Sequence, residues 1–201
     1  MCKPLTSVIL VAVLITGCNQ SSSSGSGGRG QFGPGRGFGG FRFPTDGANA
    51  EQWQEAQDAF EHGDMERAID ALEKIVQDEP KNRQGLFLLS QALENRGLDL
   101  AHGQEKKKGY EMFRQAARHM KQLRAAVPQL TPEERHSLPT VLYNESCAEA
   151  LYGQASKALD ALEDAIKSGF NEFDLMATDV DLESIRGQPR YRAIVEGLRV
   201  N

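Results

Sequence analysis

The residues with the most distinctive chemistry in this 201-residue chain are three cysteines and four histidines. The cysteines, Cys2, Cys18 and Cys147, are too few and too widely spaced for a disulfide framework. The histidines do not have the spacing of a metal site, and residues 48–201 contain no motif typical of zinc proteases, redox thiols, nucleophile elbows or phosphate loops. We therefore expect no enzymatic activity, no metal and no cofactor. The four histidines are His62, His102, His119 and His136.

Cys18 follows an apolar run, residues 5–17, whose length is typical of the core of a signal peptide. The run is shorter than the roughly 20 residues that a helix needs to span a bilayer. Lys3 supplies the positive start, and residues 15–18, Ile-Thr-Gly-Cys, look like a bacterial lipobox. This resemblance implies that residues 1–17 are removed and that the Cys18 thiol carries a lipid. The alternative is an ordinary secretory signal peptide in which Cys18 falls by chance.

Residues 18–47 form a Gly/Ser-rich segment without hydrophobic periodicity, which predicts a flexible, lipid-anchored linker. A coil of this length reaches roughly 30 Å. Its arginines and phenylalanines are separated by glycines, and two further interpretations stay open for them. They resemble RNA-binding segments, or they touch the membrane surface or fold back on the following domain. These residues are Arg29, Phe32, Arg36, Phe38, Phe41, Arg42 and Phe43.

The charge of the rest of the chain argues against nucleic acid as a partner. Four of the 23 basic residues and one of the 28 acidic residues lie in the first 47 positions, which leaves 19 basic and 27 acidic residues beyond. Phosphate binding needs clustered basic side chains, and only Lys106–Lys108 form such a run. These lysines fit either an exposed, solvated tip or a contact with anionic lipid or an acidic partner.

From residue 48 onward the hydrophobic pattern is that of amphipathic helices. In the first pair of helices, small residues stand at Ala56 and Ala68, Gly63-Asp64 forms the turn, and Pro80 ends the unit. These features resemble a tetratricopeptide repeat, a helix–turn–helix unit of about 34 residues. The resemblance implies an all-α fold in which small residues let the paired helices approach closely.

Two further units follow, so the resemblance covers roughly residues 49–198. In the second, an insertion of about 14 residues separates the first helix from its partner, and residues 98–109 either lengthen the helices or form a loop. The third unit, residues 138–170, is followed by a segment that resembles the sealed, end-of-group variety of the repeat. This implies a C-terminal capping helix. Cys147 lies on an apolar helix face in this unit, where we expect a buried thiol.

Together these resemblances predict a signal peptide (1–17), a linker (18–47) and a helical repeat domain (48–201). The protein is then exported and anchored in the bacterial cell envelope, facing the periplasm, where its concave surface recognises other proteins and no small-molecule substrate. A structural spacer or assembly subunit without a binding groove is the alternative, followed by an enzyme with an unrecognised site. The aromatic groove candidates fit the core as well as the groove. The candidates are Trp53, Gln57, Phe60, Phe87, Gln91, Glu94 and Tyr143.

Overall fold

A computed structural model describes residues 42–198 of the chain. These residues belong to one compact unit. Within the described range the structure is helical throughout and has no strand, which confirms the predicted all-α class. Cys18, the predicted signal peptide and most of the predicted linker lie outside the described residues.

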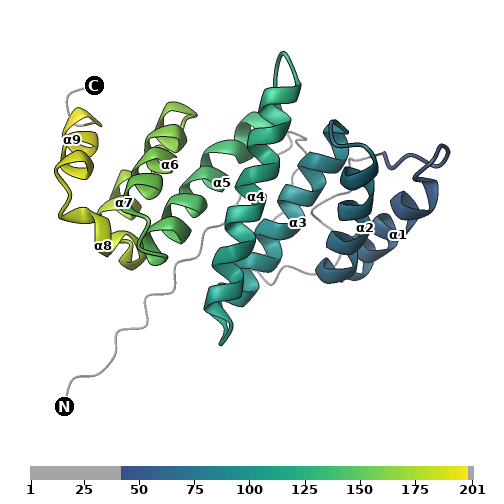
Figure 1. Ribbon diagram of the computed structural model, residues 1–201, viewed down its shortest axis with the longest axis horizontal. Coiled ribbons are helices and arrows are strands. Elements are labelled where there is room, and N and C mark those ends of the chain that lie inside the picture. The colour runs from purple at the N-terminus through teal and green to yellow at the C-terminus, as the bar shows by residue number, and fades with distance from the viewer. Residues whose placement is uncertain (1–41, 199–201) are drawn as a thin grey trace, which may run out of the picture. The chain divides into compact units, whose positions relative to one another are not determined.

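Six helices form three consecutive hairpins, and each helix packs against the next along the chain (Figure 1). The first hairpin pairs α1 (Ala50–His62) with α2 (Met65–Asp78). The second pairs α3 (Arg83–His102) with α4 (Lys106–Ala126), and the third pairs α5 (Pro132–Leu151) with α6 (Ala155–Lys167). Four short elements follow. They are α7 (Phe173–Thr178), the 3-10 turn η1 (Val180–Leu182), α8 (Glu183–Arg186) and α9 (Pro189–Leu198).

Glycines with a left-handed backbone make the same turn in the first and third hairpins. Gly63 and Gly153 both have φ +72°, a conformation that side-chain-bearing residues rarely adopt. Each glycine donates its N–H to the carbonyl three residues before it, and the residue after it donates to the carbonyl five residues back. The two turns therefore have matching hydrogen bonds, and both hairpins reverse the chain in the same way.

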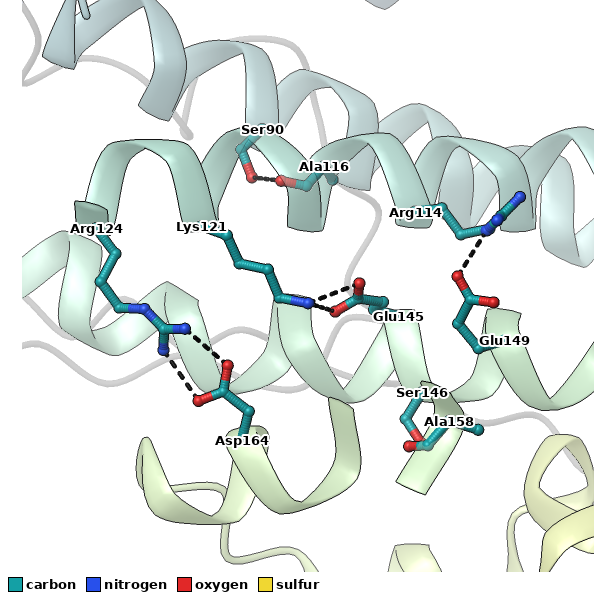
Figure 2. Close-up of polar contacts among 10 residues, drawn as sticks. All are labelled: Ser90, Arg114, Ala116, Lys121, Arg124, Glu145, Ser146, Glu149, Ala158 and Asp164. Carbon is teal, nitrogen blue, oxygen red and sulfur yellow. Dashed lines mark hydrogen bonds and ion pairs between the residues drawn. The ribbon is translucent and has the colours of Figure 1, made fainter. Parts of the chain in front are cut away.

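Small residues occupy the place where the two helices of each hairpin meet. Ser146 Oγ donates a hydrogen bond to Ala158 O at 2.8 Å, and Ser90 Oγ donates to Ala116 O at 3.0 Å (Figure 2). All four residues are fully buried. Their small side chains leave room for the two helices to approach this closely. The partners are 12 residues apart in the third hairpin and 26 in the second, so the second hairpin contains 14 extra residues.

The extra residues lengthen the helices of the second hairpin, which decides between the two possibilities left open by the sequence. The helices α3 and α4 contain 20 and 21 residues, whereas α1 and α2 contain 13 and 14. Gly97, seven residues after Ser90 as Gly63 is after Ala56, lies inside α3 and makes no turn. The long pair of helices is visible in Figure 1 as α3 and α4.

The C-terminal elements seal the last hairpin by packing on α5 and α6. The ring of Tyr143 on α5 stacks on Phe170, with centroids 4.2 Å apart. Tyr143 also donates its hydroxyl to Asp179 Oδ2 at 2.7 Å, and Tyr191 on α9 donates to Met176 O at 2.8 Å. Apolar rings and their hydroxyls thus hold residues 170–191 against the hairpin.

Candidate functional site

The candidate site is one face of the three first helices, α1, α3 and α5. Ala56, Ser90 and Ser146 occupy equivalent places in these helices, so equivalent residues can be counted from them. We define the first-helix face as the residues three before, one after and four after each of the three. The first-helix face comprises Trp53, Gln57, Phe60, Phe87, Gln91, Glu94, Tyr143, Cys147 and Ala150.

The four aromatic side chains of the first-helix face lie in the core. Their exposed fractions are 3% for Trp53, 6% for Phe60, 5% for Phe87 and 3% for Tyr143. Of the two settings that the sequence left open for these rings, their burial is that of the core, because burying a large aromatic side chain is strongly favourable when a neighbouring segment can cover it. Other parts of the same chain provide that cover at both ends of the face.

At the N-terminal end, the covering segment contains Phe43. Its ring centroid lies 6.2 Å from those of both Trp53 and Phe60, and its side chain is half-buried. Next to it, Gln84 Nε2 on α3 donates to the backbone carbonyl of Arg42 at 2.8 Å. Residues 42 and 43, which belong to the predicted linker, therefore contact the helical domain, as the interpretation of folding back expects.

At the C-terminal end, residues after α6 cover α5. Phe170 stacks on Tyr143, and Asp179 accepts its hydroxyl hydrogen bond. The same carboxylate oxygen lies 3.7 Å from Cys147 Sγ. Cys147 is buried, as predicted, and its burial raises the pKa of the thiol well above its ordinary value, so the thiol is not activated as a nucleophile.

Glu94 is the unusual polar residue of the first-helix face. Its side chain is 7% exposed, Oε2 accepts a hydrogen bond from Asn144 Nδ2 at 2.7 Å, and Oε1 has no partner among residues 42–198. Burial raises the pKa of this carboxyl to about 8, while the Asn144 hydrogen bond opposes the rise. The sequence marked Glu94 as a groove candidate but gave no sign of its burial.

Solvent reaches the first-helix face mainly at two glutamines. Gln57 and Gln91 are half-buried, whereas the other seven residues of the face are buried. Gln57 Nε2 donates to Glu61 Oε1 at 2.9 Å. The accessible part of the face therefore presents amides, which suit contacts with the backbone or polar side chains of a bound segment.

A hollow of about 430 Å³ lies between α4, α5 and α6 and is lined almost entirely by charged side chains. Figure 2 shows the ion pairs around it: Lys121 to Glu145 at 2.6 Å, Arg124 to Asp164 at 2.7 Å, and Arg114 to Glu149 at 2.9 Å. The Arg124 hydrogen bond also lowers the pKa of Asp164. The lining residues are Lys121, Glu145, Glu149, Lys157, Asp160, Ala161, Asp164 and Lys167.

These ion pairs join the second hairpin to the third, because α4 supplies the cations and α5 and α6 supply the carboxylates. Their partners are 24 to 40 residues apart in sequence, so no local spacing could have predicted them. Since most of the charges are already paired, we interpret the hollow as a joint between repeats. Asp160 on its rim is likewise paired, with Arg190 at 2.7 Å.

Lys106, the first residue of the lysine run at the start of α4, contacts a C-terminal element. Lys106 Nζ lies 3.0 Å from Asp181 Oδ1, the Tyr110 hydroxyl donates to the other oxygen of Asp181, and Tyr152 donates to Lys107 O at 3.1 Å. Lys108 forms an ion pair with Glu105. Lys106 stays exposed to solvent, and its charge also neutralises a carboxylate of η1.

Neither a metal site nor a membrane span is found in the described part of the chain. Residues 42–198 contain no cluster of three His, Cys, Asp or Glu side chains arranged to hold a metal ion. In the same range, every helix is too short or too polar to cross a bilayer.

Comparison with known proteins gives one short similarity. The chain is 39% identical over 56 residues to a chloroplastic protein of Arabidopsis thaliana. This stretch is 28% of the present chain and only 16% of that protein's length. No family model matches the chain, and no solved structure matches it.

Proposed function

We propose that this protein is a lipid-anchored bacterial lipoprotein whose tetratricopeptide-like repeats bind a segment of another protein along the first-helix face. Three features support the repeat assignment. Ala56 and Ala68 share their 12-residue spacing with Ser146 and Ala158, the glycine turns match, and the last hairpin carries a cap. A stack of such hairpins builds an extended surface suited to peptide segments.

The observation that carries the proposal is that an irregular peptide segment already lies on this face. Residues 42 and 43 have neither helical nor strand structure, yet a ring contact and a hydrogen bond from the Gln84 side chain to a backbone carbonyl hold them on α1 and α3. A surface that binds one segment through an apolar ring and a carbonyl has the chemistry to bind another. Gln57 and Gln91 supply accessible amides on the same first-helix face.

Anchoring would make even a weak interaction effective. A lipid on Cys18 confines the domain to a membrane surface, and the following Gly/Ser-rich residues let it reach partners on the same membrane. Confinement raises the effective concentration of a partner without any new contact. We therefore place the recognition event in the cell envelope, on the side that faces the periplasm.

A structural spacer is the second candidate function, because seven of the nine residues of the first-helix face are buried and charged pairs lock the repeats together. A domain with these properties suits a rigid spacer as well as a binding protein. In this role Phe43 would only complete the core, and no partner segment would contact Gln91.

A matched pair of substitutions separates the two functions. Gln91→Lys changes the accessible part of the first-helix face, and Gln77→Lys makes the same change at an exposed residue of α2. We expect one protein to co-isolate stoichiometrically with the wild type and with Gln77→Lys from crosslinked membranes, and at least tenfold less with Gln91→Lys. Equal recovery with both variants would favour the spacer.

A further inference from the structure

We propose that Phe43 is a built-in ligand that closes the first-helix face, and that a partner segment carrying a phenylalanine must displace it. This inference rests on the proposed function of the same face and adds its regulation. The site consists of the Trp53 and Phe60 rings on α1 with the Gln84 amide on α3. Its ligand is a phenyl ring that follows an accessible backbone carbonyl.

The geometry of the contact is that of a ligand in a site. The Phe43 and Trp53 rings meet edge to face, with an interplanar angle of 62°, and the Phe43 and Phe60 rings are tilted by 41°. Both centroid distances, 6.2 Å, fall within the range of favourable aromatic pairs. Phe43 itself stays half-buried, whereas Trp53 and Phe60 are 3% and 6% exposed. The two rings that form the site are therefore buried like core residues, whereas the ring that occupies the site is partly exposed.

The segment that connects Phe43 to α1 is short, and its backbone conformation is restricted. Pro44 follows Phe43 and restricts it to an extended backbone. Gly47, at φ +95°, turns the chain toward α1, and the buried Asn49 donates to Glu79 Oε1 at 2.8 Å. Only six residues separate Phe43 from the start of α1 at Ala50, so its effective concentration at the site is on the order of millimolar.

The short connection to α1 keeps Phe43 at a high local concentration, with which a partner segment must compete. A free segment with the same contacts competes with a millimolar occupant, so wild-type protein binds it weakly. Removing the Phe43 ring removes the competitor and leaves Trp53, Phe60 and Gln84 in place. The chain thus has a recognition site that opens only to partners of high local concentration, which is the situation that membrane confinement creates.

Trp53 reports on the site directly, because it is the chain's single tryptophan. The test uses full-length protein in detergent and the variants Phe43→Ala and Phe43→Leu. The control is Phe173→Ala, which removes a phenyl ring that is 42% exposed on α7. The probe is the peptide acetyl-GARFPT-amide, the sequence of residues 40–45 with alanine in place of Phe41, and its control is acetyl-GARAPT-amide, which has no phenyl ring.

We expect Phe43→Ala to shift Trp53 emission to the red, Phe43→Leu to shift it less, and Phe173→Ala to leave it unchanged. The phenylalanine peptide restores the blue emission of Phe43→Ala with a Kd at least tenfold lower than its Kd for wild type, and the alanine peptide does not. Unchanged emission in both Phe43 variants, or equal effects of the two peptides, overturns the inference. If the peptide result holds while Gln91→Lys leaves co-isolation intact, the site stands and the proposed function fails.

Discussion

Gly109 on α4 packs so closely on Gly97 of α3 that a Cβ atom added to Gly109 would lie 2.5 Å from the Gly97 carbonyl oxygen. It would also lie 2.6 Å from the backbone nitrogen of Ala101. A Cβ on Gly97 would lie 2.7 Å from the Phe113 ring. The two glycines thus let the lengthened helices touch backbone to backbone. At the equivalent point, the first and third hairpins form their turns.

Gly109→Ala should therefore loosen the extended end of the second hairpin. The new methyl group meets backbone atoms that cannot rotate away, and we expect a loss of about 1–3 kcal/mol in the free energy of unfolding. Gly103→Ala is the matched control, because its Cβ would lie 3.5 Å from the nearest atom, an ordinary contact. Urea unfolding measures both, and equal stability of the two variants would refute the close packing.

The hydroxyl of Ser146 predicts two graded effects at the crossing of α5 and α6. Ser146→Ala removes the hydrogen bond to Ala158 O but adds no atoms, so we expect a loss of about 1 kcal/mol. Ser146→Leu forces a branched side chain into a fully buried contact and should cost about 3 kcal/mol or more. A leucine variant as stable as the alanine variant would show that the helices are not in tight contact.

Glu94 predicts a dependence of stability on pH. Its pKa is about 8 in the folded protein against an ordinary value of 4.5, because burial disfavours the charged form. The folded state then keeps a proton that the unfolded chain releases, so the free energy of unfolding falls as pH rises from about 4.5 to about 8. From this single group we expect a loss of about 2–5 kcal/mol.

The matched variant for this effect is Glu94→Gln, which keeps the shape and cannot ionise. Thermal or urea unfolding at pH 5 and pH 8.5 should give a difference between wild type and variant that grows in favour of the variant at the higher pH. A constant difference across this range would mean that the Glu94 carboxyl titrates normally.

Lipidation of Cys18 is open to direct measurement. Protein extracted from membranes should begin at Cys18 and carry the added mass of acyl chains, and Cys18→Ala should leave the membrane fraction. Intact-mass spectrometry with cell fractionation checks both. A Cys18→Ala variant that stays membrane-bound with the mass of wild type would eliminate the lipid anchor.

Local signals in the sequence were sufficient to predict that the chain forms helical hairpins. Gly63 and Gly153 end helices because of their own backbone freedom, and Ala68 and Ala158 are small wherever helices must meet. The 14-residue insertion also follows from counting along the sequence. The sequence does not show that the inserted residues are helical, because Gly97 has the spacing of a turn. Only its packing against Gly109 keeps it in the helix.

The site was harder to predict, because its state depends on contacts between distant segments. Trp53 has the same amphipathic setting whether it lines a groove or lies under Phe43, and Tyr143 is buried by residues that follow it by 27 and 36 positions. The burial of Glu94 likewise comes from the packing of α3 near Asn144 of α5. Sequence spacing identifies the face, and long-range packing decides which of its residues remain accessible.

Photocrosslinking from the first-helix face in living cells tests the central claim most directly. A photoreactive amino acid at Gln91 should give one discrete adduct with another envelope protein, and the same residue at exposed Gln77 on α2 should give none. Mass spectrometry of the adduct should place the crosslink in a phenylalanine-containing segment of the partner. Absence of any adduct from Gln91, or the same adduct from both positions, would contradict recognition along this face.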